Sequence, residues 1–138
     1  YSLSNTGTKP IITDEYRHNF VNLGGGDIDE GYTIELTGKP ELKVMIENAV
    51  VSDGKLKLTK VSEGPFNVLV KELPENGDRY TSVLSNKKKS MYLLERDYFL
   101  PSTVHIWGTS YVISIEIFKK ITLQPGDTME WKREFVFQ

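Results

Sequence analysis

The fold is decided by the C-terminal stretch Lys119-Lys120-Ile121-Thr122-Leu123-Gln124-Pro125-Gly126-Asp127-Thr128-Met129-Glu130-Trp131-Lys132-Arg133-Glu134-Phe135-Val136-Phe137-Gln138. Pro125 fixes φ and Gly126 tolerates the positive φ of a tight turn, so the chain is expected to reverse there. After the turn, charged side chains alternate with apolar ones, which stand at Met129, Trp131, Phe135 and Phe137. This period of two predicts a β-strand with one buried face and one face in water.

The same alternation recurs along the whole chain, with almost no helical period to compete with it. Further strands are predicted at 11–23, 32–36, 41–48, 55–61, 66–71, 80–84, 91–94, 103–107 and 110–118. Turn signals separate them, such as Asp53-Gly54, which tolerates a tight hairpin turn. Short turns between alternating strands are typical of two packed antiparallel sheets.

We therefore expect an all-β fold, an antiparallel, immunoglobulin-like β-sandwich, with a β-barrel or a jelly roll as the alternative. The chain is expected to form one sandwich domain over residues 11–138, after a flexible N-terminal lead at residues 1–10. Its 138 residues are enough for one domain with its own core.

Composition disfavours or excludes several classes of protein and site. The 17 basic and 19 acidic residues leave a net charge of −2, whereas nucleic-acid binding rests on a basic surface, so no nucleic-acid partner is expected. No apolar run approaches the ~20 residues of a membrane-spanning helix. Because the chain has no cysteine, disulfides, thiolate metal sites and cysteine nucleophiles are excluded.

The N-terminal segment bears on the compartment. Residues 1–10 are polar and rich in turn formers, and the sequence starts at Tyr1 rather than at methionine. This favours a trimmed product from which a leader has been removed. We expect an exported or cell-surface bacterial protein, extracellular or in the cell envelope, with the cytoplasm as the alternative.

A glycine-rich acidic segment is the candidate metal site. It reads Gly24-Gly25-Gly26-Asp27-Ile28-Asp29-Glu30-Gly31. Calcium prefers carboxylate and carbonyl oxygens on a tightly curled loop, so Asp27, Asp29 and Glu30 are candidate calcium ligands. The alternative is a connection whose acidic side chains keep it solvated.

Two other segments are candidate ligand-binding loops. Tyr98 and Phe99 precede Pro101, and we expect this apolar segment to face outward, as interaction sites do. Lys87, Lys88 and Lys89 are expected at a loop tip between two strands, with a solvated tip as the alternative to a binding role.

No catalytic residue can be assigned from the sequence. The two histidines, His18 and His105, have no second histidine or acid cluster nearby, and pairs of carboxylates can be chosen only arbitrarily. Arg133 interrupts an apolar strand face, so it is expected either to pair with an acid of a neighbouring strand or to bind a ligand anion.

A resemblance adds to this interpretation. The segments Ser62-Glu63-Gly64-Pro65-Phe66-Asn67-Val68-Leu69-Val70 and Leu123-Gln124-Pro125-Gly126-Asp127-Thr128 are similar to those of small immunoglobulin-like bacterial domains, among them the intracellular proteinase inhibitors.

The function expected from the sequence is a non-catalytic module that binds a protein or a glycan through its strand-end loops. The first alternative is a protease inhibitor that presents the lysine tip. The second is a small carbohydrate-active enzyme with converging acids in a pocket.

Overall fold

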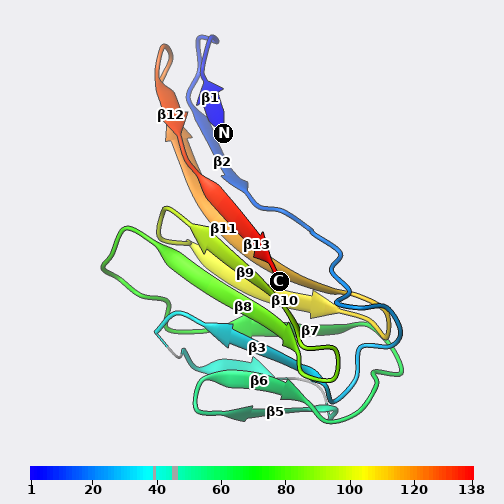
Figure 1. The fold of residues 1–138 in the computed structure, drawn as a ribbon. Coiled ribbons are helices and arrows are strands. Elements are labelled where there is room, and N and C mark those ends of the chain that lie inside the picture. Colours follow the sequence, from blue (N-terminus) through cyan, green and yellow to red (C-terminus); the bar gives the residue numbers. More distant parts are fainter. Residues whose placement is uncertain (39, 45–46) are drawn as a thin grey trace.

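The computed structural model describes residues 1–38, 40–44 and 47–138 (Figure 1). Across these residues the chain forms thirteen strands and no helix, so the predicted all-β antiparallel sandwich is confirmed. In the described part of the chain, no helix is long and apolar enough to cross a membrane. The strands are β1 Ser2–Ser4, β2 Ile11–Glu15, β3 Tyr32–Leu36, β4 Leu42–Val44, β5 Ala49–Ser52, β6 Lys55–Leu58, β7 Phe66–Val70, β8 Tyr80–Asn86, β9 Met91–Asp97, β10 Thr103–Gly108, β11 Ile113–Leu123, β12 Thr128–Glu130 and β13 Arg133–Phe137.

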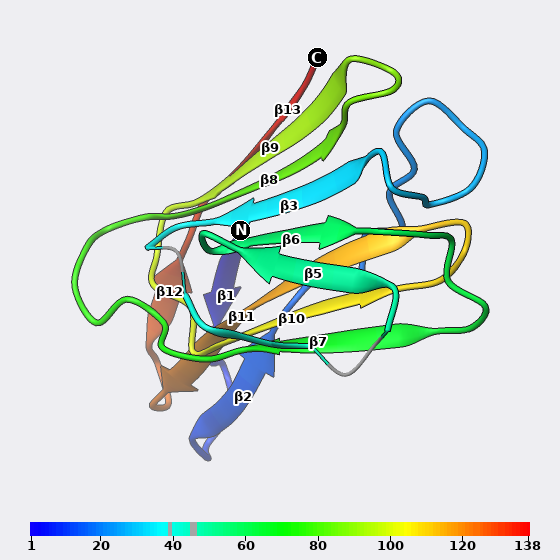
Figure 2. The same cartoon turned by 90° about the horizontal axis from the view of Figure 1, so that it is seen from below.

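Two antiparallel sheets form the layers. One has the strand order β13-β9-β8-β3-β6-β5 and the other β2-β11-β10-β7-β4, while β1 pairs with β12 (Figure 2). Strand β13 is therefore an edge of the six-stranded sheet, and β2 is an edge of the five-stranded sheet. These two edges border the site described below.

Alternation places the core between the sheets. In β8 the side chains are buried at every second residue from Tyr80 to Asn86, because successive side chains point to opposite faces of the sheet and one face packs on the core. Central core members such as Tyr32, Val68 and Ile106 have no exposed surface. The hairpin predicted at Asp53-Gly54 is confirmed, because these residues join β5 to β6 with φ of 54° and 68°. The predicted strand at 41–48 is found as β4, and its residues 45 and 46 lie outside the described part.

Residues 1–10, predicted as an N-terminal lead, include a short strand and a buried side chain. Ser2–Ser4 form β1 and pair with β12. Asn5 is buried, and its side-chain amide donates hydrogen bonds to the carbonyl oxygens of Lys9 and Leu123. Backbone pairing thus joins Ser2–Ser4 to β12, which the polar composition of the segment does not suggest.

The predicted strand at 11–23 is interrupted. β2 pairs with β11 as far as Glu15↔Lys119, and the isolated bridge Val21↔Ile113 resumes the same register. In between, rings of this segment lie on aromatic rings of β10 and β11. Tyr16 stacks on Phe118 with ring centroids 4.3 Å apart, and the centroid of Phe20 lies 5.7 Å from that of Trp107. Residues 16–20 therefore follow the sheet edge without completing its backbone ladder.

A close contact inside the sandwich gives a first prediction. A Cβ on Gly108 would lie 2.3 Å from Cζ of Phe66, its cross-strand neighbour on β7, and 3.0 Å from the carbonyl oxygen of Val112. Gly108→Ala should lower the free energy of unfolding by about 1–3 kcal/mol, because the buried ring must move. Urea denaturation measures the change.

The matched control is Gly64→Ala, since a Cβ on Gly64 would meet open space. Adding Phe66→Leu to Gly108→Ala should recover part of the lost stability. Equal losses in the two glycine variants would show that the contact with the ring is not the cause.

Candidate functional site: the open edge of the sandwich

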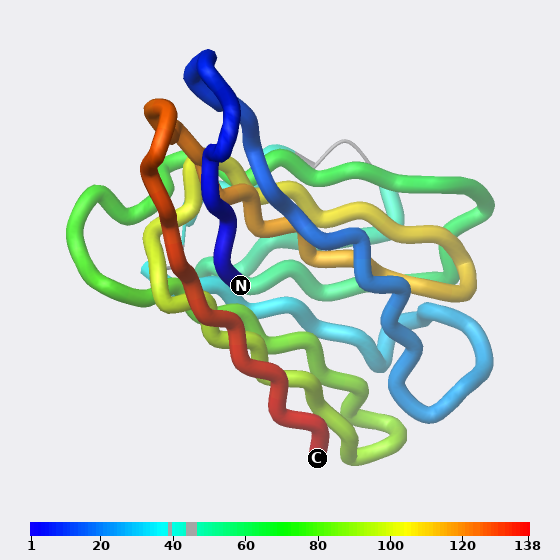
Figure 3. The backbone as a smooth tube through the Cα atoms, turned by 90° about the horizontal axis from the view of Figure 1, so that it is seen from above, coloured from blue at the N-terminus to red at the C-terminus, as the bar shows by residue number. Residues whose placement is uncertain are grey.

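A groove lies at the edge of the sandwich where β13 faces residues 17–22. Its volume is about 610 Å³. It is lined by Tyr1, Arg17, Asn19, Phe20, Val21, Asn22, Leu93, Phe135 and Phe137. Three of these rings are largely in solvent, with exposed fractions of 61% for Tyr1, 63% for Phe20 and 65% for Phe137. Figure 3 shows β13 and the segment after β2 as two separate chain paths on this side of the molecule.

Alternation accounts for only part of this lining. Arg17, Asn19 and Val21 line the groove, while Tyr16 and His18 contact rings of β11 and β10. Phe20 and Asn22, which have the parity of Tyr16 and His18, also line the groove. On the opposite wall, Phe135 and Phe137 stand two residues apart on one face of β13. Exposed apolar side chains that gather in a groove are typical of interaction sites, so the groove is a candidate.

Two arginines cross between the sheets beside the groove. Arg133 of β13 forms ion pairs with Asp97 of β9 at 2.6 Å and with Glu15 of β2 at 2.5 Å. It also donates a hydrogen bond of 3.0 Å to the carbonyl oxygen of Ile117. Arg17 crosses in the opposite direction and pairs with Glu95 of β9. We call Glu15, Arg17, Glu95, Asp97 and Arg133 the arginine clamp.

The clamp explains the interruption of the β2–β11 ladder. Arg17 lies opposite Ile117 in the register shared by β2 and the bridge at Val21. The guanidinium of Arg133 binds the carbonyl oxygen of Ile117 that this ladder would otherwise use. The expected pairing of Arg133 with an acid of a neighbouring strand is confirmed, because Asp97 is its cross-strand partner.

Burial perturbs the carboxyl groups of the clamp. The pKa of Glu95 is raised to about 7, chiefly by burial and then by the charge of Asp97, against the opposing effects of Arg17 and Arg133. Burial also raises the pKa of Asp97, and the two arginines offset part of that rise. The Oδ2 of Asp97 and the Nε atoms of both arginines have no hydrogen-bond partner among the described residues. The clamp has three carboxyl groups for two guanidinium groups, so its negative charge is not fully balanced when all three acids are ionised.

The expectation that Phe99 faces outward is wrong. Phe99 is only 8% exposed, and two cations lie close to its ring, Lys119 Nζ at 4.7 Å and Arg133 Cζ at 4.8 Å from the ring centroid. A ring beside a buried guanidinium gains cation–π attraction in addition to its burial. Phe99 therefore supports the clamp from within the sandwich.

Tyr98 is partly exposed, at 38%, but its ring and hydroxyl are engaged. Lys132 Nζ lies 4.6 Å from the ring centroid, and the hydroxyl donates a hydrogen bond of 3.2 Å to Glu134. Tyr98 also borders an open hollow of about 610 Å³ beside Tyr1 and Trp131, whose rings stack on each other at 5.5 Å.

The acidic loop and the lysine tip, predicted as two separate sites, contact each other. Lys88 Nζ lies 2.7 Å from Asp29 and 2.6 Å from Glu30. These contacts lower the pKa of both carboxyl groups, with the hydrogen bond from Lys88 as the largest cause. The ammonium group of Lys88 thus occupies the position where the calcium hypothesis places a cation. Within the described residues, no group of three or more His, Asp or Glu side chains is placed to hold a metal ion.

The remaining members of these two segments do not join that contact. Asp27 lines a hollow of about 290 Å³ together with Lys89, and the side chain of Lys89 covers Gly24. Lys87 is exposed in the turn between β8 and β9.

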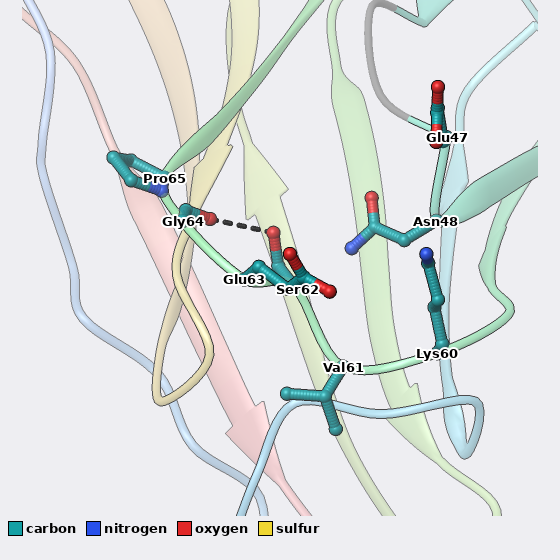
Figure 4. Close-up of a pocket in the computed structure, with 8 residues that line it drawn as sticks. All are labelled: Glu47, Asn48, Lys60, Val61, Ser62, Glu63, Gly64 and Pro65. Carbon is teal, nitrogen blue, oxygen red and sulfur yellow. Dashed lines mark hydrogen bonds between the residues drawn. The ribbon is translucent and has the colours of Figure 1, made fainter.

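A separate hollow of about 210 Å³ lies at the connection from β6 to β7 (Figure 4). Its lining is mostly polar, and the hydroxyl of Ser62 donates a hydrogen bond of 2.6 Å to the carbonyl oxygen of Gly64 across the turn. The buried Asn48 also lines it, and its Nδ2 has no hydrogen-bond partner among the described residues. Among the described residues that line this hollow there is no aromatic ring, so the groove is the stronger candidate.

The sequence does not predict the two acids of β9 in the clamp, because the predicted strand ends too early. The strand predicted at 91–94 continues to Asp97 as β9. Because Glu95 and Asp97 share the parity of the buried Leu93, extending that strand by three residues would have placed both acids on the inner face. Comparison with protein-family models, with curated proteins and with solved structures gave no match for this chain.

Proposed function

We propose that this protein is a non-catalytic binding module that recognises an apolar segment of a partner protein in the groove beside β13. The observation that carries the proposal is the grouping of Tyr1, Phe20 and Phe137, each more than 60% exposed, along one groove of about 610 Å³. Burying a ring of this kind contributes roughly 1.5–3 kcal/mol, so two such contacts suffice for a measurable affinity.

A protein ligand fits this surface better than a glycan. A sugar platform needs ring faces that are free to stack on the sugar. Instead, Lys132 lies over the ring of Tyr98, and the rings of Tyr1 and Trp131 stack on each other. The groove itself carries Arg17 as its charged side chain, and that guanidinium already pairs with Glu95.

The acids of the clamp support a structural role rather than catalysis. Glu95 and Asp97 converge, but Arg17 and Arg133 pair with them, and less than a tenth of each acidic residue is exposed. A general acid or base must reach the proton that it transfers. The expectations of an immunoglobulin-like class and of an exported or cell-surface bacterial protein stay part of this proposal.

A panel of fluorescein-labelled peptides tests the function. It contains heptapeptides Ser-Φ-Thr-Φ-Thr-Φ-Ser, with Φ as Val, Leu or Phe, and amphipathic helical peptides carrying the same apolar residues. At least one peptide should bind in fluorescence anisotropy, and the variant Phe20→Ser/Phe137→Ser should weaken its binding about tenfold or more.

The matched control is Val50→Ser, which removes an exposed apolar side chain from β5, the opposite edge strand of the same sheet. This variant should bind as tightly as the unsubstituted protein. If no peptide of the panel binds, or if Val50→Ser weakens binding as much as the double variant, the groove is not the recognition site.

A further inference from the structure

The edge of β13 that faces away from β9 allows an inference about the conformation of the bound partner. This inference rests on the proposed function. We infer that the groove takes an extended segment of a partner protein as an added β-strand, antiparallel to β13, with an apolar side chain at every second residue. Main-chain hydrogen bonds then provide affinity, and the groove selects the apolar side chains.

The alternation of hydrogen-bonded pairs along β13 and β9 shows which backbone groups of β13 are free. Gln138 and Tyr92 exchange both of their backbone hydrogen bonds, at 3.0 and 2.7 Å. In an antiparallel ladder such pairs alternate, so Glu134 and Val136 also face β9. The N–H and C=O groups of Arg133, Phe135 and Phe137 point the other way, and none of them has a hydrogen-bond partner among the described residues.

An existing ladder sets the direction and register of the added strand. β1 runs antiparallel to β12, and at its end Tyr1 and Trp131 exchange backbone hydrogen bonds of 3.0 and 3.1 Å. Trp131 has the same parity as Arg133, Phe135 and Phe137, so the free groups of β13 continue the side of the chain that β1 already uses. In Figure 3, β1 lies beside the path that leads from β12 into β13. An added strand therefore continues an interface that the fold already forms.

The same geometry defines the side chains of the partner. Residues that face each other in an antiparallel pair project to the same side of the sheet. The partner residues that bond to Phe135 and Phe137 therefore direct their side chains toward the groove, whose lining includes Phe20 and Leu93. The hydrogen-bonding residues and the apolar residues of the partner are one and the same set, and about seven residues span β13.

Backbone methylation tests this inference on the tightest heptapeptide of the panel. Methylating the nitrogens of its three Φ residues removes the donors that face β13, and binding should fall at least tenfold. Methylating the intervening Thr nitrogens alters donors that face solvent, so binding should change less than about threefold. The two peptides have the same side chains and serve as controls for each other.

Amide hydrogen exchange gives a second readout on the intact protein. When the heptapeptide binds, the amides of Arg133, Phe135 and Phe137 should become protected at least tenfold. Those of Glu134 and Val136, which already bond to β9, should change little.

Certain results from the peptide and exchange experiments would overturn the inference. They are equal loss of binding from the two methylated peptides, unchanged exchange at residues 133, 135 and 137, and binding of the helical peptides alone. After any of these results, the proposed binding function of the groove is retained if Phe20→Ser/Phe137→Ser still weakens peptide binding. Absence of binding by every peptide removes both. A dimer in sedimentation whose β13 amides are already protected would assign the edge to a second copy and overturn the inference.

Discussion

Replacing Arg133 by methionine is expected to lower the free energy of unfolding by about 3–5 kcal/mol. The guanidinium is 1% exposed and contacts carboxylates on both sheets, Asp97 at 2.6 Å and Glu15 at 2.5 Å. Methionine fills much of the same volume but takes this positive charge away from both acids, and it leaves Asp97 with only the more distant guanidinium of Arg17, 3.8 Å away. Breaking a buried ion pair from one side is costly because the remaining charge stays desolvated. Urea denaturation followed by Trp fluorescence measures the loss.

Arg96→Met is the matched control, because Arg96 pairs with Glu134 on the same two strands at 2.8 Å but on the exposed face. A surface pair of this kind contributes about 0–1 kcal/mol. Adding Asp97→Leu to Arg133→Met should recover part of the stability, since it removes one unpaired acid. Equal effects of Arg133→Met and Arg96→Met would show that the clamp does not hold the sheets together.

The large effect expected at Arg133 also shows what the sequence could reveal. Alternation in the last twenty residues predicts the strand, and the charged residue on its apolar face indicates a partner on a neighbouring strand. The sequence does not show that this partner is Asp97, because residues 97 and 133 become neighbours only when β9 pairs with β13. Pairing between strands distant in sequence is a tertiary property that local periodicity does not encode.

The candidate site is predicted less well than the fold, for a related reason. The sequence predicts an outward-facing loop at Tyr98 and Phe99, yet Phe99 is buried with Lys119 and Arg133 close to its ring. Conversely, Phe20 and Phe137 stand in alternating segments typical of buried faces, but the fold leaves them on an edge without a covering strand. Which strand becomes an edge depends on strand order, and the lengths of turns do not determine that order.

Raising the pH from about 5 to 8 is expected to destabilise the protein by about 2–3 kcal/mol through Glu95. Its pKa is raised from 4.5 to about 7 in the folded state, because burial and Asp97 disfavour the charged form more than Arg17 and Arg133 favour it. The folded state therefore binds more protons than the unfolded state across this window. The stabilisation is fully present below pH 4.5 and is lost as the pH rises through about 7. Urea denaturation at a series of pH values measures this slope.

Glu95→Gln should flatten this dependence, because the amide keeps the shape and the hydrogen-bonding ability of the protonated acid but does not titrate. Glu134→Gln is the control on the neighbouring strand, since Arg96 lowers the pKa of Glu134 and its contribution is lost only as the pH falls. Asp29 and Glu30 likewise have lowered pKa values beside Lys88, so they titrate below the window in which Glu95 dominates. Two results would contradict this prediction: a stability that rises between pH 5 and 8, or a pH dependence that Glu95→Gln leaves unchanged. Either result would mean that the two arginines hold Glu95 ionised in the folded protein. The clamp would then be a fully charged network.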